Sequence, residues 1–308
     1  MISVIFPVYN EEDSIAQLHG RLVKVLTALG EPYEIIAVDD GSTDSSRQKL
    51  STLSPITVVM FSRNFGQNAA LDAGFQVAIG DLVITIDSDL QNVPEDIPKL
   101  VEKLKAGYGT VVGWRKNRHD SFQRRTFSRL ANWLVGWVTG VKLHDFSCAL
   151  KGYRREFIDG VQLLGETFIF MPVFAHDRGA RIAEIEIIHE PRRQGVSKHH
   201  IGEMICVFFD LLSVKFILNY FAKPLRFFGS VAMLFFGMSV VAFGSAIVLK
   251  ILHLKDFSIT PLPLIGTMLI ILAVLIFMLG FITEILLRIY YDKKDTTQYM
   301  IYEIVKNK

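Results

Sequence analysis

Cysteine is scarce in this chain, with only Cys148 and Cys206 among 308 residues. Two cysteines cannot form a disulfide framework, and no Cys-x-x-Cys pair or Cys/His cluster indicates a zinc site. Charged residues are also sparse, at 21%, and nearly balanced, with a formal net charge of +2. This balance gives no indication of nucleic-acid binding, so we expect no nucleic-acid partner.

Several short motifs are missing as well. No Gly-x-Gly-x-x-Gly follows the first apolar run, and no Gly-x₄-Gly-Lys-Ser/Thr occurs, which disfavours dinucleotide binding and P-loop hydrolysis. The first residues, Met-Ile-Ser-Val-Ile-Phe-Pro, lack the basic segment and the long apolar segment of a secretory signal. They indicate a buried strand, so we expect the first two hundred residues to form a cytosolic domain.

Apolar residues, in contrast, are abundant. They make up 50% of the chain, and the mean hydropathy is +0.33, which excludes a disordered chain. The excess lies in two uncharged runs, Phe227–Leu249 and Leu262–Thr283. The first run would form a helix of about 34 Å, close to the bilayer core of about 30 Å. Buried core helices are the alternative, but two adjacent runs of this length favour two membrane spans.

Basic residues lie outside this pair of runs on both sides: Lys215, Lys223 and Arg226 before it, and Arg288, Lys293 and Lys294 after it. The connection between the runs carries only Lys250 and Lys255. By the positive-inside rule, both ends of the chain are predicted to be cytoplasmic.

These observations divide the chain into four parts. We expect a cytosolic catalytic domain at residues 1–200, a juxtamembrane amphipathic helix at 201–225, two transmembrane helices within 226–288 and a cytosolic tail at 289–308.

Strands and helices alternate through the first part. The predicted strands are Ile2–Pro7, Tyr33–Val38, Ile56–Phe61, Leu82–Ile86 and Thr110–Val112, and the predicted helices are Glu11–Leu29, Ser45–Leu53, Asn68–Ile79 and Pro94–Lys105. Such alternation predicts an α/β fold with a mostly parallel sheet covered by helices. Ligands of such sheets bind at the carboxyl ends of the strands.

Carboxylates stand at two of these strand ends. Asp39 and Asp40 follow the second strand, and Asp87 and Asp89 follow the fourth. Acidic groups gathered at one sheet edge repel one another unless a cation compensates them. Their oxygens suit Mg²⁺ or Mn²⁺, which also take phosphate oxygens. Turn or cap aspartates on solvated loops are the alternative, but the two motifs together in this context favour a site.

Six stretches now make the chain recognisable: Phe6–Glu12 (FPVYNEE), Val38–Asp44 (VDDGSTD), Ser62–Gln67 (SRNFGQ), Ile86–Gln91 (IDSDLQ), Asp145–Arg154 (DFSCALKGYR) and Pro191–Lys198 (PRRQGVSK). In this order, with two spans behind them, they resemble family 2 glycosyltransferases of GT-A fold. The resemblance is to the polyprenyl-phosphate glycosyltransferases, which include dolichol-phosphate mannose synthases and bactoprenol glucosyltransferases.

The resemblance implies a role for each matching residue. It implies a nucleotide pocket lined by Pro7, Tyr9, Glu11, Asp39, Asp87 and Ser88, a Mg²⁺ or Mn²⁺ site at Asp87, Asp89 and Gln91, and phosphate-binding residues Arg115, Arg129, Arg193 and Lys198. It also assigns Asp89, Arg129 and Asp145 to catalysis. The sequence after Asp145 departs from the commoner family pattern, so its role stays open between a base and a group that orients the substrates.

The implied reaction is an inverting transfer of a sugar from a nucleoside diphosphate to an undecaprenyl or dolichyl phosphate. UDP is the first choice of nucleotide and GDP, as GDP-mannose, the second. A phosphate monoester has a second pKa of about 6, so the acceptor is largely ionised near neutral pH and needs no strong base. It needs cations beside the anionic donor. Glucose, mannose, galactose, an amino sugar or a modified arabinose would all fit this frame.

The remaining expectations concern the membrane and partners. Phe122–Val138 and Ile201–Phe221 combine basic and aromatic residues, which favours helices at the bilayer surface, with packing inside the domain as the alternative. The paired His199 and His200 are expected on a surface loop rather than as metal ligands. Thr297–Val305 alternates enough to form a strand, and reaching a neighbouring copy would give a homo-oligomer.

Two other functions compete with this one. A processive polysaccharide synthase shares the catalytic fold, but no Gln-x-x-Arg-Trp occurs here and two spans are too few for a channel. An inactive membrane scaffold or sugar-nucleotide sensor is the second alternative. The intact Asp87, Asp89 and Gln91 argue against it.

Overall fold

The computed structural model describes residues 1–116, 132, 135–137, 139–161, 167–190, 224–254, 256–257, 259–292 and 301–307. The chain divides into two compact units. The first combines Met1–Val214 with Thr297–Lys308, and the second is Lys215–Thr296. The predicted amphipathic helix at 201–225 lies almost entirely outside the described residues and stays a prediction, as do the exact domain boundaries.

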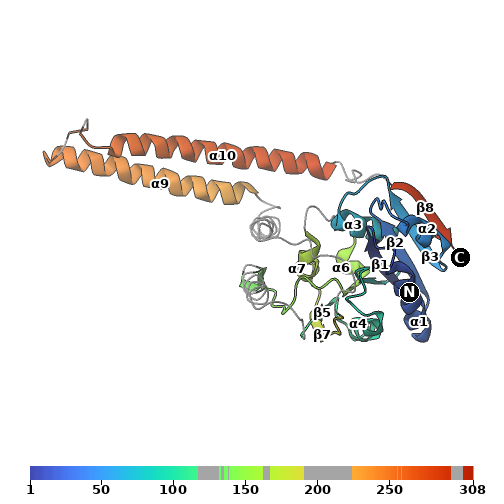
Figure 1. The fold of residues 1–308 in the computed structure, drawn as a ribbon. Helices are drawn as coiled ribbons and strands as arrows, with labels where there is room; N and C mark the ends of the chain where they lie inside the picture. Colours follow the sequence, from blue (N-terminus) through green and yellow to red (C-terminus); the bar gives the residue numbers. More distant parts are fainter. Residues whose placement is uncertain are drawn as a thin grey trace. The chain divides into compact units, whose positions relative to one another are not determined.

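An eight-stranded sheet forms the centre of the first unit, in the order β7-β5-β6-β4-β1-β2-β3-β8. Its strands are β1 (Ile2–Val8), β2 (Tyr33–Asp39), β3 (Ile56–Phe61), β4 (Leu82–Thr85), β5 (Thr110–Trp114), β6 (Lys151–Arg154), β7 (Ile182–Glu186) and β8 (Ile301–Asn307). Only β6 and β8 run against the other strands, so the sheet is mostly parallel, as predicted (Figure 1).

The sheet is buried on both faces because its central strands are apolar on both. All seven residues of β1 are buried. Val4 and Phe6 belong to the core on one face, whereas Ile5 belongs to the core on the other. Near-continuous apolar strands of this kind are typical of parallel sheets that helices cover on both sides.

The helices and short 3₁₀ turns of the first unit are α1 (Ile15–Ala28), α2 (Ser46–Thr52), α3 (Gln67–Val77), η1 (Pro94–Asp96), α4 (Ile97–Lys105), α6 (Arg155–Ile158), η2 (Thr167–Phe170) and α7 (Met171–Asp177). The buried residues of α1 and α4 join the first core, and those of α3 join the second. A Cβ at Gly74 would come within 2.3 Å of Ile5, so glycine allows α3 to lie directly on β1.

Two antiparallel strands complete the sheet. The antiparallel β6 lies between β4 and β5. β8 pairs antiparallel with β3 of the same chain, from Ile56 opposite Asn307 to Phe61 opposite Ile301. The predicted C-terminal strand therefore exists, and it extends the sheet of its own domain.

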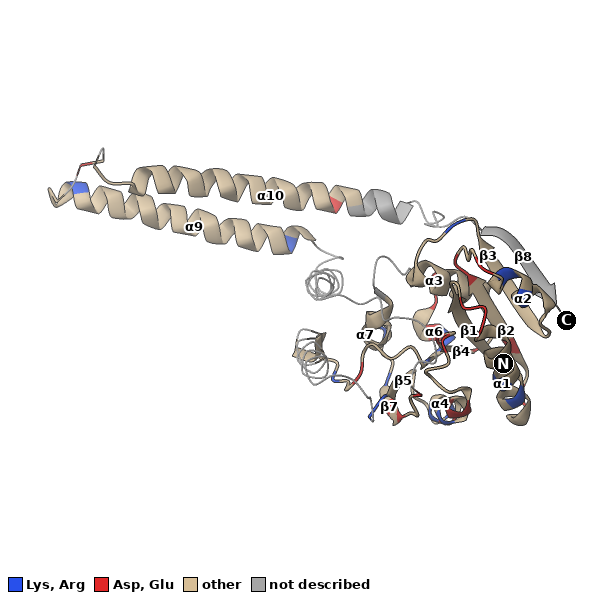
Figure 2. Cartoon of the chain, viewed as in Figure 1, with Lys and Arg blue, Asp and Glu red and all other residues tan. Residues whose placement is uncertain are grey.

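The described part of the second unit contains the helices α9 (Pro224–Ile251) and α10 (Leu262–Asp292). Both are long and apolar enough to cross a membrane, and charged residues are nearly absent along them (Figure 2). Small residues allow the two helices to pack closely: the Ser239 hydroxyl donates to the Gly266 carbonyl at 2.8 Å, and Gly266 lies against the Phe243 ring. Small residues at the contact are typical of paired membrane helices.

Candidate active site

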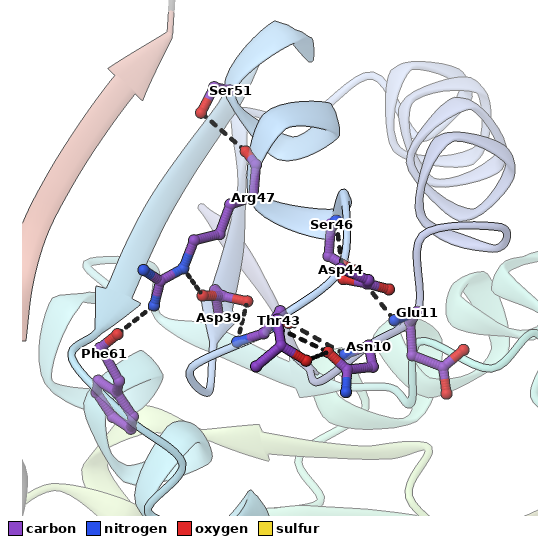
Figure 3. A network of polar contacts seen from close by, with 10 residues as sticks. Asn10, Glu11, Asp39, Thr43, Asp44, Ser46, Arg47, Ser51 and Phe61 are labelled. Atoms are coloured by element: carbon purple, nitrogen blue, oxygen red, sulfur yellow. Dashed lines mark hydrogen bonds and ion pairs between the residues drawn. The ribbon is translucent and has the colours of Figure 1, made fainter.

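The loops that follow β1 and β2 are joined side by side at the carboxyl edge of the sheet (Figure 3). Asn10 has a left-handed φ of 55°, which lets its side-chain oxygen accept the Thr43 backbone N–H at 2.8 Å. Its own backbone N–H donates to the Ser42 hydroxyl at 3.1 Å, and that of Glu11 donates to the Ser46 hydroxyl at 3.1 Å. These bonds hold Asn10 and Glu11 against the loop after β2 and the start of α2.

Asp39, at the end of β2, is fully buried. One carboxylate oxygen accepts the Ser42 N–H at 3.2 Å, and the other accepts Nε of Arg47 at 2.6 Å. The same guanidinium also donates to the Phe61 carbonyl at the end of β3 (Figure 3). Asp39 is therefore bound to groups of the protein, and Arg47 is a residue of this site that the sequence analysis missed.

Asp40 fixes the next loop along the sheet. Its two oxygens accept the backbone N–H groups of Phe65 at 2.7 Å and Gly66 at 3.0 Å. Burial raises the pKa of Asp40, and the neighbouring Asp39 carboxylate adds to this, while the two N–H donors act against it. Gly41 has a φ of +72°, and a Cβ there would lie 2.4 Å from the Arg63 carbonyl carbon. The loops after β2 and β3 thus touch through a glycine.

The acidic turn Asp87–Gln91 follows β4. Leu90 occupies the left-handed region with a φ of 62°, and the Gln91 N–H donates to the Asp89 carboxylate at 3.1 Å. Asp87 accepts Nε2 of Gln67 at 2.9 Å. Burial and the nearby Asp89 carboxylate together raise the pKa of Asp87 to about 7, against the opposing effects of Arg115 and Gln67. A pair of carboxylates that repel each other in this way is relieved when a cation binds between them.

Arg115, directly after β5, forms a two-pronged ion pair with Asp145. Its Nε and Nη2 lie 2.6 and 2.9 Å from the two carboxylate oxygens, and Nη2 also contacts the Ser147 hydroxyl at 2.8 Å. Both side chains are largely buried. Burial opposes the charge of Arg115, yet the Asp145 carboxylate raises the guanidinium pKa above its usual value. Asp145 therefore holds Arg115 charged and fixed in orientation.

Two further buried groups lie beside this pair. Burial raises the pKa of the Cys148 thiol to about 12, so this thiol is protonated and is not a nucleophile. Lys151 of β6 is fully buried, and its ammonium contacts the Phe168 carbonyl at 3.2 Å. Its register places it opposite Thr85 of β4 and Val112 of β5. The sequence analysis quoted Lys151 within a motif but gave it no role.

The segment before Pro191 lies next to the acidic turn. The Glu190 N–H donates to the Gln91 carbonyl at 2.9 Å, and the Ile188 N–H donates to the buried Asp96 carboxylate at 2.7 Å. In the sequence, Arg193 follows this point beside Gln91 by three residues.

The predicted site residues divide by position. Pro7, Tyr9, Glu11 and Asp39 lie at the ends of β1 and β2, Asp87, Ser88, Asp89 and Gln91 follow β4, and Arg115 follows β5. Arg129, Arg193, Lys198, His199 and His200 lie outside the described residues, as does most of Phe122–Val138 and all of Ile201–Phe221. Their predicted roles stay predictions.

The residues present fit a metal that substrate helps to hold. Among the described residues, no group of three or more His, Cys, Asp or Glu side chains could hold a metal alone. Asp87 and Asp89 would supply carboxylate oxygens, and Gln91 would supply an amide oxygen. Mg²⁺ in proteins commonly takes one or two carboxylates and completes its shell with substrate phosphates and water. Paired acids after a central strand of a mostly parallel sheet, without a P-loop, fit the class of GT-A-type sugar transferases.

The family assignment agrees with this class. The model of glycosyl transferase family 2 matches residues 3–161, so the chain belongs to glycosyltransferase family 2. It is 37% identical to the dodecaprenyl-phosphate galacturonate synthase of Rhizobium johnstonii, across 98% of this chain and 92% of that protein. It is 35% identical to the undecaprenyl-phosphate 4-deoxy-4-formamido-L-arabinose transferase of Aeromonas hydrophila, across 100% of this chain and 94% of the relative.

Solved structures share the fold. Glucosyl-3-phosphoglycerate synthase from Mycobacterium tuberculosis, in complex with Mn²⁺, uridine diphosphate and phosphoglyceric acid, superimposes with a TM-score of 0.56 at 20% identity. The match covers 71% of this chain and 78% of that protein. The predicted GT-A fold, followed by two apolar helices, is confirmed.

Proposed function

We propose that this protein transfers a sugar, with inversion, from a nucleoside diphosphate to the phosphate of a membrane polyprenyl phosphate. The observation that carries the proposal is similarity along nearly the whole chain to relatives named for transfer to dodecaprenyl and undecaprenyl phosphate, together with the acidic turn Asp87–Gln91. The similarity extends through the two apolar helices, which such an acceptor requires because it cannot leave the bilayer.

The donor would lie along the carboxyl ends of β1, β2 and β4. Pro7, Tyr9, Glu11 and Ser88 would line the nucleotide, and Asp39 would shape the pocket through Ser42 and Arg47. Asp87, Asp89 and Gln91 would hold Mg²⁺ or Mn²⁺ on the diphosphate. A metal bound there supplies positive charge to the leaving nucleoside diphosphate. UDP is favoured and GDP is second.

The acceptor phosphate would meet Arg115, together with Arg129, Arg193 and Lys198. Because Asp145 occupies Nε and Nη2 of Arg115, the Nη1 edge of the guanidinium is the one left for the phosphate. We assign Asp145 to orienting Arg115, since an ionised acceptor needs no base and a carboxylate paired with arginine is a poor one.

The decisive experiment is sugar transfer to undecaprenyl phosphate by the full chain in lipid vesicles, screened with UDP- and GDP-sugars and detected by mass spectrometry. With the active donor, Asp89→Asn is expected to lower the rate by at least about 100-fold, because it removes a metal ligand. Asp81→Asn is the matched control, since Asp81 is exposed and pairs with the N-terminal amine. Full transfer by Asp89→Asn contradicts the metal assignment.

We further propose that the protein is an integral membrane homo-oligomer. Its two helices would cross the bilayer and leave both termini in the cytoplasm. β8 ends the sheet, and its outer edge has no strand partner within the described part of the chain, so it offers a surface for a second copy. The molecular size in detergent of the full chain and of a chain ending at Met300 tests this; equal subunit numbers contradict a contact through β8.

A further inference from the structure

Arg47 is the residue that the site gained from the structure. It lies in the first turn of α2, and its guanidinium connects the carboxyl ends of two neighbouring strands, at Asp39 of β2 and Phe61 of β3 (Figure 3). Its side chain is 33% exposed, whereas Asp39 is fully buried. Arg47 is thus the partner of this ion pair that a ligand can approach.

Arg47 has hydrogen-bond donors that the described part of the protein does not use. A guanidinium carries five N–H donors and no acceptor. Asp39 takes the Nε donor and Phe61 takes one Nη2 donor. Within the described residues, Nη1 makes no hydrogen bond, so both of its donors and one on Nη2 are free for a ligand.

The Asp39 carboxylate, in contrast, already accepts hydrogen bonds from the protein. The two Asp39 oxygens accept from Ser42 and Arg47. The charged group that reaches solvent here therefore donates hydrogen bonds and accepts none. A nucleobase placed at this edge would have to present an acceptor.

We propose that Arg47 recognises the base of the nucleoside diphosphate by donating to a ring carbonyl oxygen, which selects keto bases over amino bases. This inference rests on the proposed function and deepens it. Uracil presents O4 and guanine presents O6, whereas cytosine and adenine present an exocyclic amino group at the corresponding position. An amino group facing N–H donors leaves both without a partner, and that loss is costly in a closed site.

UDP and CDP form the sharpest test because they differ chiefly in O4 against the amino group at C4. Binding of both is measured by calorimetry on the full chain in detergent with Mg²⁺, without acceptor. The native chain is expected to bind UDP about 100-fold more tightly than CDP. Arg47→Lys keeps the charge beside Asp39 but loses the fork of donors. It is expected to weaken UDP binding at least about 10-fold, leave CDP binding little changed and so reduce the ratio accordingly.

Arg155→Lys is the matched control. Arg155 also donates from Nε and Nη2, to the carbonyls of Gly80 and Ala78, but it lies at the amino end of β4, away from the carboxyl edge. This variant is expected to keep the native UDP-to-CDP ratio. Thermal unfolding of both variants shows that they fold.

The outcomes separate the two proposals. No binding of any nucleoside diphosphate contradicts the proposed function itself. Binding without preference for keto bases, or an equal loss of UDP and CDP affinity in Arg47→Lys, contradicts only the role of Arg47 and leaves it as a structural bridge. GDP and ADP are measured in the same way to decide between uracil and guanine. The preferred nucleotide is the one, UDP or GDP, whose affinity falls in Arg47→Lys.

Discussion

Lys151 places a basic side chain inside the sheet, on β6 between β4 and β5. Its side chain is fully buried between strands that end at the acidic turn and at Arg115. Burial lowers its pKa to about 8, although the nearby Asp145 carboxylate favours the charged form. An unfolded lysine has a pKa of about 10.4. Below pH 8 both states are protonated, so the cost of burying the charge is fully present.

The sign of the pH dependence follows. Between pH 8 and about 10.4 the unfolded chain binds more protons than the folded chain, so stability rises with pH. Over this window the free energy of unfolding of the native chain should rise by up to about 3 kcal/mol relative to that of Lys151→Met, which has no titratable group at this position. Thermal unfolding in detergent at several pH values measures this difference. Lys103→Met, at an exposed position on α4, removes the same charge as a control; an identical pH dependence in both variants contradicts the prediction.

Gly41 supports a second residue-scale prediction. Alanine at Gly41 would combine a left-handed φ with a Cβ 2.4 Å from the backbone of Arg63, and backbone cannot move aside cheaply. We expect Gly41→Ala to lower the free energy of unfolding by at least about 3 kcal/mol. Gly30→Ala is the matched control, because Gly30 has a similar φ of +68° but open space around it.

Gly30→Ala should therefore cost only about 1 kcal/mol. Denaturation midpoints of the two variants compare these values directly. A similar loss of stability in both variants would mean that the loops after β2 and β3 can move apart at little cost, which contradicts the prediction.

At the scale of residues, the acidic side chains of the site could be predicted from the sequence better than the basic ones. Asp39, Asp40, Asp87 and Asp89 could be predicted because each follows an apolar strand, and the end of a strand is visible in the pattern. Arg47 and Lys151 could not be placed in the same way. The role of Arg47 depends on how far α2 lies from β3, and that of Lys151 depends on the register of a four-residue strand.

At the scale of elements, β8 carries the clearest consequence. It covers an edge of β3 that would otherwise expose unpaired backbone groups. A chain ending at Met300 should therefore exchange the amide hydrogens of Ile56–Phe61 much faster than the full chain, because those that face β8 lose their partners. Hydrogen exchange followed by mass spectrometry measures this. Deletion of Lys308 alone leaves β8 intact and is the control; unchanged exchange in the longer deletion contradicts the pairing.

The first four strands could be predicted from the sequence because each is an apolar run of ordinary length, and all four are confirmed within about a residue. The structure corrects the start of α1, which we expected at Glu11 and which begins at Ile15. The backbone N–H groups of Asn10, Glu11 and Glu12 bond instead to side chains in the loop after β2 and at the start of α2. β6 was missed because it is short and contains two basic residues.

At the scale of the whole molecule, β8 also constrains membrane topology. It follows both apolar helices in the chain, yet it pairs with β3, which precedes them. Segments that share one sheet lie on the same side of a membrane, so an even number of crossings must separate them. The pair α9 and α10 satisfies this condition, and the basic residues that flank the pair favour the cytoplasm for that side.

Single cysteines introduced into a cysteine-free background test this arrangement. Asp256→Cys, in the connection between α9 and α10, should react with a membrane-impermeant maleimide added to intact cells, because the connection emerges on the far side. Glu31→Cys, in the turn before β2, should react only after the membrane is opened. If both sites react in intact cells, or neither does, the helices do not form a hairpin across the bilayer. In that case β8 and the catalytic domain would share one side of the membrane without any crossing between them. Reaction of Glu31→Cys alone would place the catalytic domain outside, where a cytoplasmic nucleotide sugar could not reach it.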